Sequence, residues 1–286
     1  MSTPAYLVMP QWQGSPSSRA MRLADGAALL REDLPPTARV DVAVPLEAGD
    51  ALGTPVARLS SLVQARDAAR TAISGAVESG HDTPIILGGD CASSLAGIEH
   101  AASGDGTLAV LWLDAHPDLQ HPDTSPSGAA SGMTLRHALG DGAPELVSAH
   151  PLDPARILLA GARAYDPEED EVAERHGIRA LAPHDSPDEF AAQLVAALGD
   201  ADRLYVHIDL DVLDPAEFAS VHTAVPFGLG IGHVTAALRA AVAAVPLAGA
   251  AICEFAPSDD AAAAEDLPTV LRILAALTSG GQRAAA

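Results

Sequence analysis

The chain has 286 residues, enough for one large α/β domain with a full core, and 48% of them are hydrophobic, which excludes a disordered protein. Its net charge of -22, from 16 basic and 38 acidic residues, argues against nucleic-acid binding and favours cations, including metal ions and basic small molecules. Two cysteines, Cys91 and Cys253, suit a reducing cytoplasm, and we expect neither a signal peptide nor a membrane-spanning segment.

Short apolar segments alternate with longer amphipathic ones along the chain, and segments 59–80 and 188–200 have the spacing of helices. Near-continuous apolar strands are typical of a parallel sheet that helices cover on both faces. The pattern predicts an α/β fold, a three-layer sandwich with a mainly parallel sheet, and the lack of a linker favours a single domain over residues 1–286. The expected strands lie within 5–10, 38–45, 84–90, 107–116, 156–162, 203–215 and 249–257.

Polar residues stand where four of these apolar segments end. Open α/β sheets bind ligands in the crevice beyond the carboxyl ends of their strands. Several carboxylates at one sheet edge repel one another and are costly to desolvate, and a divalent metal cluster is the simplest compensation. The residues concerned are Cys91, Asp114, His116, Asp118, Asp209, Asp211 and Glu254.

The segment 112–118 has the sequence Trp-Leu-Asp-Ala-His-Pro-Asp. Alternate residues of a strand share a face, so Asp114 and His116 can point the same way, and a turn at Pro117 can bring Asp118 round. Carboxylates with an imidazole suit Mn²⁺, Fe²⁺, Co²⁺ or Zn²⁺ better than Ca²⁺. The alternative is a polar cluster that only caps a turn.

The segment 207–215 places Asp209 and Asp211 on one face of a further apolar strand. A solvated edge strand is the alternative, and it fits poorly with the apolar residues between them. His207 is two residues before Asp209 and so shares the strand face of the two aspartates, and we expect it to lie behind them. Asp214, before Pro215, predicts a turn rather than a metal ligand.

These segments together resemble the arginase/agmatinase (ureohydrolase) family, whose pattern is Gly-Gly-Asp-His, then Asp-x-His-x-Asp, then Asp-x-Asp-x-x-Asp-Pro. The resemblance, over residues 84–257, implies the arginase fold, with a parallel sheet of about eight strands and a centre of two divalent metal ions, most often Mn²⁺. It implies Asp114, His116, Asp118, Asp209 and Asp211 as ligands, with Asp114 and Asp209 bridging. Cys91 stands where most of the family has a metal-binding histidine, and we expect it to bind metal also.

The resemblance also implies a substrate pocket and catalytic groups. Glu254 would contact the guanidinium, and Asp118 would relay a proton to the leaving amine. Ser127 would lie near the α-carboxylate of the substrate, and Asp166, with Glu169 nearby, would hold the α-amino group. Thr223 would line the guanidinium end. The presence of Ser127 and Asp166 favours an α-amino acid substrate over agmatine.

Two positions depart from the common pattern. Cys91 replaces a ligand, and Ser131 stands where arginases have a proton-shuttling histidine, a role that His121 or His222 could assist. The cysteine variant resembles the Nω-hydroxy-L-arginine amidinohydrolases of D-cycloserine-type biosynthesis, which release hydroxyurea and L-ornithine. A plain arginase, an agmatinase or a formimidoylglutamase is the alternative, and a catalytically silent metal-binding protein, with Cys91 as a small core residue, is another.

The expected partner is therefore a small arginine-like molecule, with no nucleic acid and no membrane, in a cytoplasmic enzyme. A homo-oligomer is compatible with the sequence.

Overall fold

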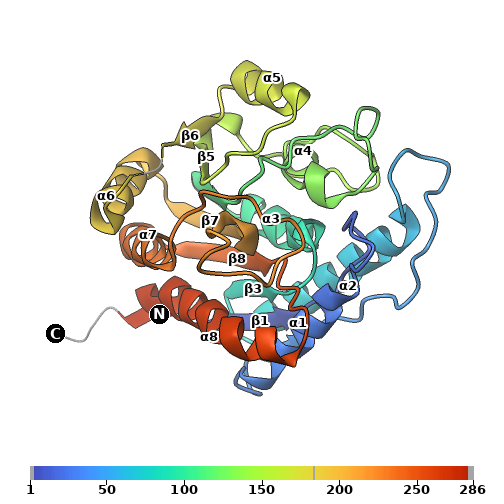
Figure 1. Ribbon diagram of the computed structural model, residues 1–286, viewed down its shortest axis with the longest axis horizontal. Coiled ribbons are helices and arrows are strands. Elements are labelled where there is room, and N and C mark those ends of the chain that lie inside the picture. The colour runs from blue at the N-terminus through green and yellow to red at the C-terminus, as the bar shows by residue number, and fades with distance from the viewer. Residues whose placement is uncertain (1–2, 183, 283–286) are drawn as a thin grey trace.

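The computed structural model describes residues 3–182 and 184–282, and its strands form one eight-stranded sheet in the order β2-β1-β3-β8-β7-β4-β5-β6 (Figure 1). Every neighbouring pair is parallel, as predicted. The strands are β1 (Pro4–Val8), β2 (Arg39–Asp41), β3 (Thr83–Leu87), β4 (Leu108–Leu113), β5 (Ile157–Ala160), β6 (Arg179–Leu181), β7 (Arg203–Asp209) and β8 (Leu247–Cys253).

Helices cover both faces of this sheet, so the predicted three-layer sandwich is confirmed. One apolar cluster joins one face of the strands to α1, α6, α7 and α8, and two others join the opposite face to α2, α3, α4 and α5. The helices are α1 (Arg22–Glu32), α2 (Leu59–Glu78), α3 (Leu95–Ala102), α4 (Thr134–Ala138), α5 (Pro167–His176), α6 (Pro187–Leu198), α7 (Ile231–Ala244) and α8 (Asp260–Leu277). The helices expected over 59–80 and 188–200 correspond to α2 and α6.

The central strands are apolar on both faces because both faces are covered. In β7, Val206 and Ile208 contribute to the cluster with α6 and α7, whereas Tyr205 contributes to the cluster with α3 and α5. This alternation places His207 on the α3 side of the sheet. Trp112 of β4 pairs with His207 in register, so these two side chains lie next to each other on that face.

The structure corrects one local expectation about the acidic segments. Asp114 and His116 follow the end of β4, and Asp211 lies in a short 3₁₀ turn, η4 (Leu210–Val212), so neither pair alternates along a strand. The cause is side-chain chemistry: Asp114 accepts a hydrogen bond from the His116 amide at 2.7 Å, and Asp209 accepts one from the Asp211 amide at 2.8 Å. Such bonds from an aspartate to the amide two residues on favour a turn over an extended chain.

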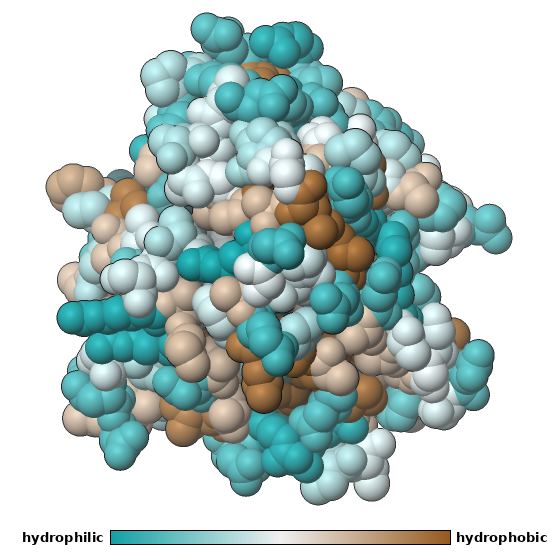
Figure 2. All heavy atoms as spheres, turned by 90° about the vertical axis from the view of Figure 1, so that its right-hand side faces the viewer, coloured by the Kyte–Doolittle hydropathy of each residue, from teal (hydrophilic) through white to brown (hydrophobic). Residues whose placement is uncertain are grey.

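None of the helices within the described ranges combines the length and the apolar character that crossing a bilayer requires. Figure 2 shows one side of the molecule, the right-hand side of Figure 1, where apolar side chains form small groups separated by polar ones. This face therefore has the mixed polarity of an ordinary exposed surface.

Candidate functional site

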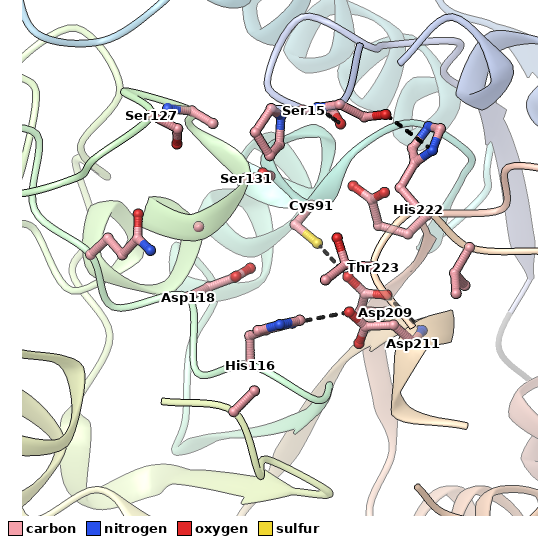
Figure 3. Close-up of a pocket in the computed structure, with 18 of the residues that line it drawn as sticks. Ser15, Cys91, His116, Asp118, Ser127, Ser131, Asp209, Asp211, His222 and Thr223 are labelled. Carbon is pink, nitrogen blue, oxygen red and sulfur yellow. Dashed lines mark hydrogen bonds and ion pairs between the residues drawn. The ribbon is translucent and has the colours of Figure 1, made fainter. Parts of the chain in front are cut away.

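The expected polar residues converge because they follow four strands that are neighbours in the sheet. Cys91 follows β3 and Glu254 follows β8, while Asp209 ends β7 and Asp114 follows β4; the order of these strands is β3-β8-β7-β4. Parallel strands end at the same edge, so the four loops surround one point. Figure 3 shows Cys91 pointing toward Asp209 and His116 pointing toward Asp211.

The donor atoms form overlapping groups, in each of which one donor atom per residue lies within 4.8 Å of the others. Asp114 belongs to two of these groups and Cys91 belongs to two. The groups are Asp114, His116 and Asp211; Cys91, Asp114, Asp118 and His207; and Cys91, Asp209 and Glu254. Two ion positions that share Asp114 would fit this arrangement.

Direct hydrogen bonds hold several of these side chains in place. His116 Nδ1 lies 3.0 Å from Asp211 Oδ2, and the Cys91 thiol donates to Asp209 Oδ2 at 3.0 Å. The indole of Trp112 donates to Asp114 Oδ2 at 3.1 Å. These contacts fix the orientation of the donor atoms before any ion binds.

Burial dominates the electrostatics of the cluster. Burial raises the pKa of Asp114 to about 7, with the charge of Asp211 adding to the effect. Burial, followed by the charges of neighbouring carboxylates, also raises the pKa of Asp118, Asp209 and Glu254 well above the usual range. So many ionisable carboxyl groups out of water are stable as anions only beside cations.

Histidine and cysteine respond to the same surroundings in different ways. Burial lowers the pKa of His116, but hydrogen bonds to Asp114 and Asp211 outweigh it and raise that pKa to about 12. Burial lowers the pKa of His207 to about 3, so its ring is neutral. Burial and then the charges of Asp209 and Asp118 raise the pKa of the Cys91 thiol.

The donor set therefore fits divalent cations. Asp118 Oδ2 is buried and has no hydrogen-bond partner within the described residues, as expected for an oxygen that faces an ion. Carboxylates, imidazole and one thiol are ligands of first-row transition metals. Asp118 and Glu254 also have positive φ angles of 53° and 65°, a conformation that non-glycine residues adopt rarely and that often occurs at functional sites.

A pocket of about 660 Å³ opens above the cluster. Asp114 is fully buried beneath it, and the other expected metal-binding residues line its floor. All five residues expected to bind substrate line the same pocket: Ser127, Asp166, Glu169, Thr223 and Glu254. The fold thus brings together, in or beneath one pocket, all the residues expected from the sequence to bind metal or substrate.

Glu169 and Asp166 join the pocket wall to the cluster of expected metal ligands. They form a capping box at the start of α5, in which the Asp166 amide donates to Glu169 Oε2 at 2.9 Å. Glu169 Oε1 accepts from the amide of Leu119 at 2.9 Å, next to Asp118. Both oxygens of Glu169 therefore bind backbone, whereas Asp166 is exposed at the pocket and receives a hydrogen bond from Gln120 at 2.7 Å.

Sequence reasoning missed part of the wall. Ser15 and Ser17 come from the loop after β1, and Ser17 Oγ lies 3.3 Å from His222 Nδ1 across 205 positions of sequence. Gln120 was also missed, although its place two residues after Asp118 was a usable signal. No local pattern could have indicated the two serines, because only the folded chain brings them to the site.

Comparison with known proteins places this geometry in a family. The profile of the arginase family matches residues 18–277. The chain is 32% identical over 222 residues to the Nω-hydroxy-L-arginine amidinohydrolase of Streptomyces lavendulae, covering 75% of this chain and 74% of that protein. It is 30% identical over 180 residues to the arginase of Bacillus caldovelox, which is 60% of each protein, so the alignment spans less than two thirds of that arginase.

The fold is similar to that of a solved arginase from Entamoeba histolytica in complex with L-ornithine. The TM-score is 0.82 at 22% identity, covering 97% of this chain and 99% of the other. Because the family profile extends over residues 18–277 and the fold agrees, this chain belongs to the arginase family.

Proposed function

We propose that this protein hydrolyses a guanidino C–N bond, with Nω-hydroxy-L-arginine and water as substrates and hydroxyurea and L-ornithine as products. The observation that carries the proposal is the cluster of four buried aspartates, buried Cys91 and half-buried His116 beside a pocket wide enough for an amino acid. The similarity to the Streptomyces lavendulae enzyme, over 75% of the chain, favours the hydroxylated substrate.

The residues that would hold two divalent ions, with Mn²⁺ the expected metal, are Cys91, Asp114, His116, Asp118, Asp209 and Asp211. Such a pair lowers the pKa of a bound water and so supplies hydroxide near neutral pH. Asp114 belongs to two donor groups, and Asp209 contacts both the Cys91 thiol and the Asp211 amide. These contacts support the expectation that the two aspartates would be the bridging ligands.

Glu254 would bind the guanidinium end of the substrate. Burial raises the pKa of its carboxyl group, and a guanidinium beside it would favour the ionised form through charge-assisted hydrogen bonds. Thr223 lines the same pocket. As the C–N bond breaks, the ornithine nitrogen must gain a proton, and the carboxyl group of Asp118 would relay it.

Ser127 and Asp166 would bind the other end of the substrate. Asp166 is exposed at the pocket, and a hydrogen bond from Gln120 fixes the orientation of its carboxylate. The carboxylate is therefore already oriented to accept hydrogen bonds from the α-amino group. Agmatine lacks the α-carboxylate that Ser127 would bind, so it should bind poorly.

Plain arginase activity is the second candidate, favoured by the similarity to the Bacillus caldovelox arginase. Hydroxylation makes a guanidine less basic, so a larger fraction of Nω-hydroxy-L-arginine than of L-arginine carries a neutral guanidine near neutral pH. With either substrate the leaving ornithine nitrogen needs a proton, and Ser131 lines the pocket where arginases are expected to have the histidine that delivers it.

The test compares kcat/KM for Nω-hydroxy-L-arginine, L-arginine and agmatine with Mn²⁺-loaded protein, and identifies the products as hydroxyurea or urea. We expect the hydroxylated amino acid to be cleaved best and agmatine worst. Equal values for the first two, or a preference for agmatine, would contradict the substrate assignment. No turnover of any of the three by fully loaded protein would favour a silent metal-binding protein.

A further inference from the structure

We propose that His207 is itself a metal ligand, and that it completes one ion position together with Cys91, Asp114 and Asp118. The inference rests on the metal centre proposed above and extends it by a residue that was expected only to lie behind the ligands. Its starting point is an imidazole that has no other evident role in the structure.

His207 is completely buried, and neither of its ring nitrogens has a hydrogen-bond partner within the described parts of the chain. A neutral imidazole has one N–H donor and one lone pair, and burying both unpaired is unfavourable. His137, another fully buried histidine, differs in this respect, because its Nδ1 lies 2.8 Å from the carbonyl oxygen of Met133. A bound ion would give the lone pair of His207 a partner.

The ring is held in a defined orientation by Trp112. The two residues pair in the register of β4 and β7, and their rings stack with centroids 3.7 Å apart and planes 8° from parallel. The same indole donates to Asp114 Oδ2. Trp112 therefore positions an imidazole and a carboxylate at once, which is the task of a group that supports metal ligands.

The distance between His207 and Asp114 suits a shared ion better than a direct bond. His207 Nε2 lies 3.9 Å from Asp114 Oδ2, beyond hydrogen-bonding range. Two donor atoms that each lie about 2.1 Å from one ion can be up to about 4.2 Å apart. One donor atom from each of Cys91, Asp114, Asp118 and His207 lies within 4.8 Å of the other three. Asp118 Oδ2 has no hydrogen-bond partner among the described residues.

This assignment gives each ion one imidazole. His116 would serve the position formed with Asp114 and Asp211, and His207 would serve the position formed with Cys91 and Asp118, with Asp114 common to both. A thiolate and an imidazole together are softer than a mainly oxygen set. The His207 position should therefore prefer Zn²⁺ or Co²⁺ over Mn²⁺ more strongly than the His116 position does.

The first test is a crystal structure of the wild-type protein loaded with Zn²⁺, with the ions located by anomalous scattering. We expect two ions, one of them about 2.0–2.3 Å from His207 Nε2. Two ions with His207 Nε2 more than 3 Å from both would overturn the inference and leave the metal centre standing. Wild-type protein that binds no ion would overturn the metal centre itself, so the two failures are distinguishable.

The second test measures Zn²⁺ binding by calorimetric titration of metal-free protein. His207→Phe keeps an aromatic ring on Trp112 and removes both nitrogens; we expect one of two binding events to weaken by more than about 100-fold, beyond the 10- to 100-fold effect of losing a supporting group. His137→Phe makes the same substitution at a buried histidine outside the site and should retain both events. Retention of both events by His207→Phe, or equal weakening of both through the shared Asp114, would overturn the ligand role.

Discussion

Glu169 connects the proposed substrate-binding end of the pocket to the proposed metal ligands, and replacing it with alanine should affect both. Its side chain is buried, and its two oxygens accept hydrogen bonds from the amides of Leu119 and Asp166. The first bond fixes the loop that carries Asp118, and the second closes the capping box of α5. Glu169→Ala removes both at once and leaves a buried amide without a partner.

The expected magnitude follows from these two bonds. A hydrogen bond to a charged acceptor contributes about 1.5–3 kcal/mol, and the desolvation of the buried carboxylate, which raises its pKa, offsets part of the sum. We expect Glu169→Ala to lower the free energy of unfolding by about 2–4 kcal/mol. Because the Asp118 loop loses its anchor, metal affinity should also fall, by about 10- to 100-fold.

The assay is urea unfolding of the metal-free protein, followed by metal titration of the folded variant. Asp170→Ala is the matched control, because Asp170 is an exposed acidic residue in the same helical turn; it should cost no more than about 1 kcal/mol and leave metal affinity unchanged. Equal effects of the two substitutions would refute the reasoning that Glu169 acts through Leu119 and Asp166.

Three further predictions concern other parts of the molecule. Asp166→Ala should raise KM for the amino-acid substrate sharply while metal content, measured by elemental analysis, stays at the wild-type value; an unchanged KM would show that Asp166 does not contact substrate. Cys91→His should slow the loss of Mn²⁺ during dialysis against a weak chelator; a loss of about 1–3 kcal/mol of stability without slower metal loss would instead indicate that Cys91 only fills space. The third concerns His137. Burial lowers the pKa of its imidazole from 6.5 to about 4, so as the pH falls this histidine binds a proton in the unfolded chain before it does so in the folded chain. This effect should reduce the free energy of unfolding of the metal-free protein below pH 6.5, by about 2 kcal/mol at pH 5. His137→Phe should remove that part of the pH dependence. If the free energy of unfolding of the variant falls between pH 7 and 5 as steeply as that of the wild type, the prediction is contradicted.

The layered fold and the edge of the sheet that carries the site could be predicted from the sequence because both depend on local patterns. Strand segments buried on two faces are apolar throughout, and their carboxyl ends are marked by Asp114 and Asp209. The order of the strands brings these ends together, and that order was not predicted from the sequence. The periodicity alone would not have placed β8 between β3 and β7.

The errors and omissions arose where contacts are not local or where side chains redirect the backbone. The turns at Asp114 and Asp209 were read as continued strand, because alternation cannot show an aspartate bonding to the amide two residues on. The Ser17–His222 contact joins distant segments. His207 is buried by neighbours from other strands, and both its ring nitrogens have no hydrogen-bond partner among the described residues. The alternation of residues along its own strand could not predict this.

The most direct test of the central claim is ornithine release as a function of the metal added to metal-free protein. With Nω-hydroxy-L-arginine in excess, the initial rate should be near zero without metal, rise with added Mn²⁺ and reach its maximum at two ions per chain, as expected for a two-metal hydrolytic site. Hydroxyurea should appear in equal amount to ornithine. Ornithine release that does not depend on metal, or its absence at every metal loading of a protein that binds two ions, would contradict the account.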